Sequence, residues 1–285
     1  MTLLAPNELS QALARYRLHE AKAGPSAQIE YLEAGSEGAP VSHVMLHGIG
    51  SSAASWIAQL HAADKNQAAK PPHVLAWNAP GYGASTALKP DEPLAEHYAA
   101  RLWQWLDEAG IKHAFTLVGQ SMGCLIAAAA ARQRPSQITR LVLFAPARGY
   151  GQASEAERIR RRDERLAALQ EHGPHGLAER RGAAMLSANA PAEMISYIRG
   201  IMSQVNPAGY TQATHMLSRG DIDTDLSSWS RPLVIASGTA DTITPAAGCQ
   251  GIAARAGVAW TDLGEVGHGC PLEAARLANA ILGLA

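Results

Sequence analysis

The sequence contains few cysteines and few phenylalanines, and it carries almost no net charge. Its 285 residues include three cysteines and two phenylalanines, and the formal net charge at pH 7 is −1. Three scattered cysteines without a Cys-x-x-Cys pair argue against a disulfide framework and a zinc site, and they indicate reduced thiols in a cytoplasm. The near-zero charge gives no indication of a nucleic-acid partner or of binding to an anionic membrane.

Long apolar runs are missing as well. Because no stretch of about 18 apolar residues occurs, the sequence predicts no membrane-spanning helix. Residues 1–6 have neither a basic start nor a long apolar run, so we expect no secretion signal and a cytoplasmic protein. A chain of 285 residues can bury a large core in one domain, or in one domain with an insertion.

The most informative motif is Gly-Gln-Ser-Met-Gly at residues 119–123. An apolar β-type run at residues 115–118 precedes it, and an alanine-rich helical run at residues 124–132 follows it. A Gly-x-Ser-x-Gly between a strand and a helix predicts a nucleophile elbow, in which the serine takes strained backbone angles. The two glycines let the strand and the helix approach without Cβ clashes. We therefore predict that Ser121 is a nucleophile, with a purely structural Gly-Ser turn as the alternative.

A serine nucleophile needs a base, which is typically a histidine held by a carboxylate. In this architecture the chain order is Ser, then Asp or Glu, then His. Asp241 follows a predicted buried strand at residues 231–238, and His268 lies in a glycine-rich loop after a predicted strand at residues 258–263. Since strand ends at one edge of a parallel sheet gather ligands, we predict a catalytic triad of Ser121, Asp241 and His268.

Other acids and histidines fit this order less well. The aspartates between residues 221 and 225 precede the strand that Asp241 follows, and no carboxylate follows the predicted strand at residues 138–144. His113 precedes a strand and is expected on the side of the sheet away from the site. The alternatives for the two selected residues are a loop-capping aspartate at Asp241 and a packed loop histidine at His268.

A tetrahedral intermediate also needs hydrogen-bond donors for its oxyanion. One is the backbone N–H of Met122, directly after the nucleophile. The other is expected from His47-Gly48-Ile49-Gly50, which follows an apolar strand. Ile49 comes directly after His-Gly and is the preferred donor, while Gly48 and Gly50 stay open. We expect His47 to order this loop by hydrogen bonding, and a plain glycine-rich turn is the alternative.

Together these motifs resemble the serine-nucleophile branch of the α/β-hydrolase superfamily. The resemblance covers the chain except for its N-terminal end and the segment around residues 150–220. Residues 77–85 are similar to the loop Asp-x-Pro-Gly-x-Gly-x-Ser of this superfamily, with Asn78 where Asp is common. Cys124 stands where the superfamily often has a second glycine after the elbow. Neither departure touches a residue that we predict to be catalytic.

Two finer resemblances concern the substrate. Residues 206–210 and 219–221, followed by a strand and Gly-x-x-Asp, resemble 3-oxoadipate enol-lactonases. Ser-Met-Gly at residues 121–123 is similar to carbon–carbon bond hydrolases that act on meta-cleavage products of aromatic rings, which implies aromatic compound catabolism. Haloalkane dehalogenases and epoxide hydrolases are disfavoured, because they have an aspartate where this chain has Ser121.

Strand and helix patterns alternate along most of the chain, which predicts an α/β fold with a mostly parallel sheet and helices on both faces. Residues 147–229 break this alternation with a helical, charge-rich segment that is too long for a loop. We expect a core domain of residues 1–146 and 230–285, with a helical lid inserted at residues 147–229. A first helix is predicted over residues 7–23.

The lid is expected to form part of the substrate pocket. The apolar side of residues 183–202 would roof it, with Met185 as one contact, and His47, Gly48 and His215 are further candidates for pocket residues. Arginines and acids alternate at helical spacing in residues 155–165, which predicts a salt-bridged, solvent-facing helix. Binding of a substrate carboxylate by one of these arginines is the alternative. The arginines are Arg158, Arg160, Arg161, Arg162 and Arg165.

The sequence therefore predicts a hydrolase that cleaves an ester or an (enol-)lactone of a small organic acid through an acyl-enzyme. His268 would take the Ser121 proton, and Asp241 would orient His268. Such chemistry requires no metal and no cofactor, and the partner is a small-molecule ester, lactone or dienoate. The alternatives are a carbon–carbon bond hydrolase for a meta-cleavage product, a cofactor-free perhydrolase and a non-catalytic small-molecule binder.

Overall fold

The computed structural model describes residues 3–36 and 38–284, so four residues of the predicted core domain, at positions 1, 2, 37 and 285, lie outside the described part. Within it, eight strands form one sheet in the order β1-β2-β4-β3-β5-β6-β7-β8. Only the pairs β1–β2 and β2–β4 are antiparallel. The predicted α/β class with a mostly parallel sheet is confirmed. The strands are β1 (Leu18–Lys22), β2 (Gln28–Gly35), β3 (His43–Leu46), β4 (His73–Trp77), β5 (Phe115–Gln120), β6 (Ile138–Phe144), β7 (Leu233–Ser237) and β8 (Trp260–Asp262).

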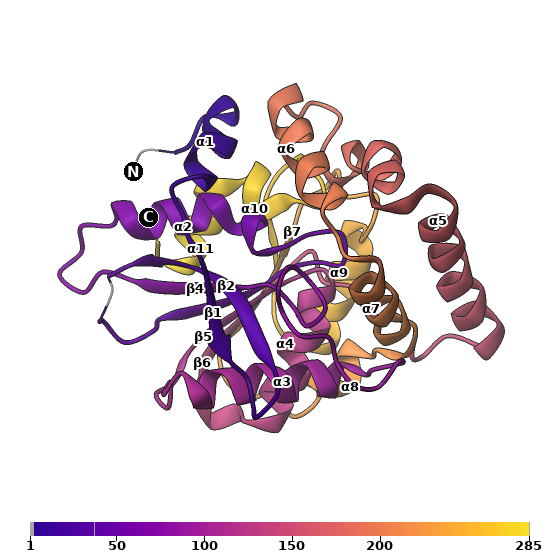
Figure 1. The fold of residues 1–285 in the computed structure, drawn as a ribbon, viewed down its shortest axis with the longest axis horizontal. Helices are drawn as coiled ribbons and strands as arrows, with labels where there is room; N and C mark the ends of the chain where they lie inside the picture. The colour runs from indigo at the N-terminus through magenta and orange to yellow at the C-terminus, as the bar shows by residue number, and fades with distance from the viewer. Residues whose placement is uncertain (1–2, 37, 285) are drawn as a thin grey trace.

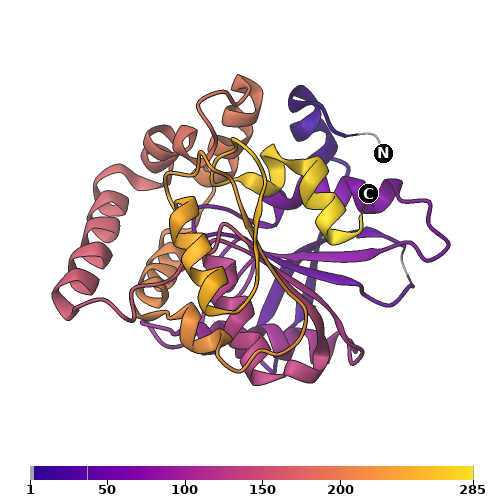
Figure 2. The ribbon, with the colours of Figure 1, turned by 180° about the vertical axis from the view of Figure 1, so that it is seen from behind.

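Helices cover both faces of the sheet (Figure 1). One face carries α3 (Ala95–Glu108), α4 (Met122–Gln133) and α9 (Ala246–Arg255), and the other carries α2 (Ile57–Lys65) and α11 (Ala275–Leu282). The view from behind shows the yellow C-terminal helices, α10 (Cys270–Glu273) and α11, above the sheet (Figure 2). None of the helices in the described ranges combines the length and the apolar character that crossing a bilayer requires.

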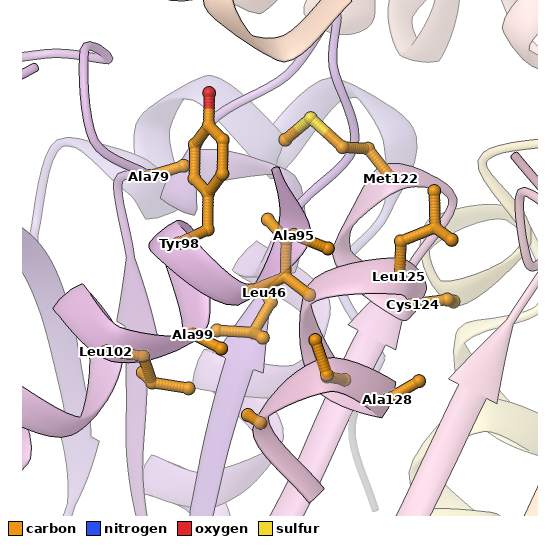
Figure 3. Close-up of a cluster of buried hydrophobic side chains, with 14 of the residues drawn as sticks. Leu46, Ala79, Ala95, Tyr98, Ala99, Leu102, Met122, Cys124, Leu125 and Ala128 are labelled. Carbon is orange, nitrogen blue, oxygen red and sulfur yellow. The ribbon is translucent and has the colours of Figure 1, made fainter. Parts of the chain in front are cut away.

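The central strands are apolar on both sides because both faces of the sheet are covered. In β6, Leu141 and Leu143 pack with α3 and α4, whereas Val142 and Phe144 belong to the cluster around α2 and α11. Figure 3 shows the first of these layers, where side chains of α3 and α4 meet beside Leu46 at the end of β3. Burial on two faces explains why such strands read as continuous apolar runs rather than as alternating patterns.

Between β6 and β7 the described chain forms helices and no strand, as predicted for the inserted segment. They are α5 (Glu155–Arg181), α6 (Ala192–Ser203), α7 (Pro207–Arg219) and α8 (Ile222–Leu226), with a short 3-10 turn at Ala183–Met185. We call residues 145–232 the helical insertion. Helix α5 packs against α6 and α7, whereas α8 packs against α4 of the core. The last part of the insertion therefore continues the core layer, and the exact domain boundaries stay a prediction.

The predicted helix over residues 7–23 is wrong in its second half. The structure has a 3-10 turn at Pro6–Glu8, a short α1 (Leu9–Leu13) and then the edge strand β1. Strand β1 pairs antiparallel with β2, which places Leu18 opposite Leu32. Strand β1 thus forms a hairpin with the strand that follows it, and this pairing overrides the helix propensity of residues 18–22.

The contact of α7 with the loop after β4 leads to a stability prediction. A Cβ on Gly209 of α7 would lie 2.2 Å from the carbonyl oxygen of Gly81, whereas a Cβ on Gly200 of α6 has nothing within 4 Å. Alanine is the better helix former at both positions, so Gly200→Ala should raise the free energy of unfolding by up to about 1 kcal/mol. Gly209→Ala should instead lower it by about 1–3 kcal/mol, because the backbones must separate.

Urea or thermal unfolding of the two variants measures this difference directly. If Gly209→Ala proves as stable as Gly200→Ala, the close packing of α7 on the Gly81 loop is not present in solution.

Candidate active site

Ser121 lies in a strained turn between β5 and α4. Its backbone angles are φ 54° and ψ −115°, a left-handed φ that non-glycine residues rarely adopt. A Cβ on Gly119 would lie 2.6 Å from the carbonyl oxygen of Gly123, and a Cβ on Gly123 would lie 2.1 Å from that of Leu46. The Ser121 N–H donates to the carbonyl of Phe144 at 3.0 Å, which fastens the turn to the end of β6. The backbone therefore has the geometry that the motif predicts.

Asp241 and His268 are in direct contact beyond the ends of β7 and β8. His268 Nδ1 lies 2.8 Å from Asp241 Oδ2, and the two residues are only 2% and 4% exposed. The other carboxylate oxygen of Asp241 accepts the backbone N–H groups of Ile243 and Thr244 at 2.8 and 2.9 Å. Two backbone donors and one ring donor thus hold this carboxylate in a single orientation.

The charge of Asp241 follows from these contacts. Burial raises the pKa of its carboxyl, but the hydrogen bonds and the charge of His268, together with the donors of Thr244, outweigh burial, so the pKa lies below its usual value. An ionised Asp241 accepts a hydrogen bond from the N–H at His268 Nδ1, which leaves Nε2 of the ring free to act as a base. This is the arrangement that a serine nucleophile requires.

Ser121 and His268 line the same cavity, whose volume is about 250 Å³. Its walls come from the core loops and from the helical insertion. The core contributes Gly48, Ile49 and Thr244, among others, and the insertion contributes apolar side chains. These apolar side chains are Leu169, Leu177, Met185, Met202, Val205 and Leu217. Of the predicted pocket residues, Gly48 and Met185 therefore lie on the cavity wall.

The other two predicted pocket residues do not line this cavity. His47 is 0% exposed; its Nδ1 donates to the carbonyl of Gly48 at 2.7 Å, and its Nε2 accepts the N–H of Ala79 at 3.0 Å. Burial lowers its pKa to about 4, so the ring is neutral and orders the loop. His215 on α7 turns instead toward Glu92, with 3.5 Å between Nδ1 and Oε1.

The predicted oxyanion donors lie at the head of α4 and in the loop after β3. Met122 is the first residue of α4, and first-turn N–H groups have no acceptor within their own helix. Ile49 lines the cavity, and its carbonyl accepts the Tyr82 hydroxyl at 2.8 Å. No hydrogen bond within the described residues takes the Ile49 N–H. Both amides are thus available, and their role as an oxyanion hole stays a prediction.

A comparison with protein families agrees with this geometry. The family described as "Alpha/beta hydrolase family" matches residues 44–280. The chain belongs to this family. The predicted membership in the α/β-hydrolase superfamily is therefore confirmed.

Curated relatives match this chain only in part. A segment of 116 residues is 32% identical to (E)-2-((N-methylformamido)methylene)succinate hydrolase of Acinetobacter baylyi, and it covers 40% of each chain. A segment of 118 residues is 30% identical to monoacylglycerol lipase abhd6-A of Xenopus laevis and covers 41% of this chain and 34% of the relative. The matched segment thus spans less than half of the length of either relative.

Solved structures share the fold over nearly the whole of this chain. The enol-lactonase from Burkholderia xenovorans has a TM-score of 0.79 at 21% identity, covering 93% of this chain and 98% of its own. An esterase from Thermogutta terrifontis has a TM-score of 0.78 at 22% identity, covering 93% and 96% of the two chains. At this level of identity the likeness establishes the α/β-hydrolase fold.

Glu273, which no pattern in the sequence singles out, joins the histidine loop to the helical insertion. Its carboxylate accepts the N–H of Gly267 at 2.8 Å and the N–H of Ser187 at 3.0 Å, and it also accepts the Ser187 hydroxyl. The N–H of Gly269 donates to the carbonyl of Met185 at 2.6 Å. Glu273 and the segment between α5 and α6 therefore hold the residues on both sides of His268. No sequence motif marks a glutamate in this role.

Glu273→Gln should loosen the histidine loop. The amide keeps the size of the side chain but loses the charge that strengthens these hydrogen bonds, so the free energy of unfolding should fall by about 1–3 kcal/mol. Amide hydrogen exchange should accelerate at Gly267 and Ser187. Glu265→Gln, an exposed glutamate in the same loop, is the matched control. Equal exchange rates in the two variants would show that Glu273 does not hold the loop.

Two buried histidines should make stability depend on pH. Burial lowers the pKa of His43 and of His47 from 6.5 to about 4. Between pH 6.5 and 4 the unfolded chain binds protons at these rings and the folded chain does not, so stability falls as the pH falls. Each ring contributes up to about 1.4 kcal/mol per pH unit. His47→Gln should flatten this slope in urea unfolding series, and an unchanged slope would contradict a neutral, buried His47.

Proposed function

We propose that this member of the alpha/beta hydrolase family cleaves a carboxylic ester or lactone of a small organic acid through an acyl-enzyme on Ser121. The observation that carries the proposal is the shared cavity, in which the strained Ser121 lies with His268, whose Nδ1 is 2.8 Å from Asp241. A serine, a histidine with a free Nε2 and an ionised aspartate form the set of groups that acyl transfer uses.

On this mechanism His268 Nε2 takes the proton of the Ser121 hydroxyl while the serine oxygen attacks the substrate carbonyl. The N–H groups of Met122 and Ile49 stabilise the oxyanion that forms. His268 then donates its proton to the leaving oxygen and activates a water for deacylation. Asp241 keeps the ring in the correct tautomer and stabilises the imidazolium during both steps.

Two observations support a small substrate. The cavity volume of about 250 Å³ lies near the lower end of the range of small-molecule sites, roughly 300–1,000 Å³. The partial relatives and fold neighbours include a hydrolase of a succinate derivative and an enol-lactonase. The helices α5 to α7 would act as a lid over this cavity. A cytoplasmic location and a role in aromatic compound catabolism remain predictions from the sequence.

Covalent labelling with a fluorophosphonate, followed by peptide mapping, tests the nucleophile. We expect one label per chain at Ser121 and none in Ser121→Ala. With 4-nitrophenyl hexanoate as substrate, Ser121→Ala should lose about 10⁴- to 10⁶-fold in kcat, and Asp241→Asn should lose about 10⁴-fold. Asp262→Asn, an exposed aspartate at the end of β8, is the matched control and should keep its activity.

More than a tenth of the wild-type activity in Ser121→Ala or in Asp241→Asn would contradict the triad. A dienoate turned over well, with poor turnover of simple esters, would instead select the carbon–carbon bond hydrolase.

A further inference from the structure

Two arginines of α5 line the cavity that contains Ser121. They are Arg165 and Arg181, and both are partly buried. Among the residues that the structure describes, neither arginine forms an ion pair or a side-chain hydrogen bond. Their neighbours differ, since Arg160 pairs with Glu157 and Glu164. The predicted salt-bridged surface of α5 is therefore present, but these two arginines are not part of it.

A break in α5 brings the two arginines to one cavity. They are 16 residues apart, and along a straight helix that separation would be about 24 Å. Gly173 interrupts the helix with φ 60° and ψ −179°, and Pro174 follows it. A positive φ suits glycine, and proline lacks the N–H that a continuous helix needs. Pro174 also lines the cavity, so the break lies at the cavity itself.

The cavity has an excess of positive charge. In the described part of the chain its wall includes three arginines and no aspartate or glutamate. The third arginine, Arg148, is paired with Asp223 at 2.9 Å. Arg165 and Arg181 instead lie near the apolar Leu169 and Leu177, which also face the cavity. A charge beside apolar walls is poorly solvated and interacts strongly with an opposite charge.

From this arrangement we infer that the substrate carries a carboxylate besides the bond that is cleaved, and that Arg165 and Arg181 bind this carboxylate. The inference rests on the proposed function and adds the charge of the substrate to it. Guanidinium groups bind carboxylates through paired N–H···O bonds, which fix orientation as well as charge. Arg165 and Arg181 would therefore orient the substrate while Ser121 attacks its ester or lactone carbonyl. The bound carboxylate takes no part in bond making or breaking.

Turnover of two matched esters tests the inference. One is the 4-nitrophenyl monoester of a six-carbon dicarboxylic acid, and the other is the neutral 4-nitrophenyl hexanoate. The wild type should prefer the anionic ester in kcat/KM. Arg165→Gln and Arg181→Gln should each raise KM for the anionic ester about 10- to 100-fold, with little change for the neutral one. Arg180→Gln, exposed and outside the cavity wall, is the matched control.

Protection of Ser121 provides a readout that does not depend on turnover. The rate of labelling by a neutral organophosphate is measured with increasing adipate or with the uncharged adipamide. Adipate should slow the labelling of Ser121 and adipamide should not. The midpoint is the adipate concentration that halves the labelling rate. In Arg165→Gln and in Arg181→Gln this midpoint should be at least ten times higher than in the wild type. Equal effects of adipate and adipamide, or midpoints that match the Arg180→Gln control, would overturn the inference.

The outcomes separate the inference from the function on which it rests. If Ser121 is labelled and the neutral ester is cleaved as well as the anionic one, the hydrolase is correct and the carboxylate site is wrong. If Ser121 is not labelled at all, the proposed function itself fails. If Arg165→Gln and Arg181→Gln keep the wild-type preference for the anionic ester in kcat/KM, the two arginines are not its binding site.

Discussion

The close approach of the first turn of α4 to the end of β3 is the constraint on which the site depends. At Gly123 no side chain fits, because a Cβ would lie 2.1 Å from the carbonyl oxygen of Leu46. This contact brings Ser121 and the N–H of Met122 next to the loop that begins at His47. A nucleophile from one strand end and an amide from another thus share one edge of the sheet. The strain at Ser121 is sustained by the packing of buried helices against the strands around it.

The loops at this edge also hold one another in place. The Thr244 hydroxyl lies within 2.8 to 3.1 Å of Asp241 Oδ2, His268 Nδ1 and the carbonyl of Ala145. It therefore links the acid and the base to the loop after β6, where Ala145 has a φ of 45°. Since a hydroxyl has one proton, it donates to one acceptor at a time. Each of the three contacts nevertheless places the same hydroxyl between the loops that carry Asp241, His268 and Ala145.

The parts of the site that the sequence predicted are those that local backbone geometry determines. Ser121 directly follows β5, and Asp241 and His268 lie in the loops after β7 and β8, so a strand–turn pattern suffices to select them. The orientation of the His47 ring depends on the N–H of Ala79, which belongs to a different strand end. Such a nonlocal partner leaves no periodic signal in the sequence. The edge strand β1 pairs with β2, the next strand along the chain, and helical spacing in residues 7–23 hid the turn between α1 and this strand.

The insertion was harder to predict for the same reason. Helical spacing correctly indicated the salt-bridged surface of α5, but it assumes a continuous helix. Helix α5 is not continuous, because it breaks at Gly173 and Pro174. The break places Arg181 in the cavity that Arg165 also lines. The direction of a chain after such a break is set by packing against α6 and α7 rather than by the two residues alone. A glycine–proline pair within a helical pattern nevertheless favours a break in the helix at that position.

The electrostatics of the cavity connect the insertion with the chemistry of the core. On the proposed mechanism His268 becomes positively charged while the oxyanion forms, and Asp241 balances that charge. Arg165 and Arg181 line the same cavity, and within the described part of the chain neither side chain has an ion-pair partner. A substrate carboxylate bound between them would neutralise their charge and hold the substrate in one orientation while Ser121 attacks. A neutral ester would make only apolar contacts with this part of the wall, so the insertion would select among substrates without changing the chemistry of the core.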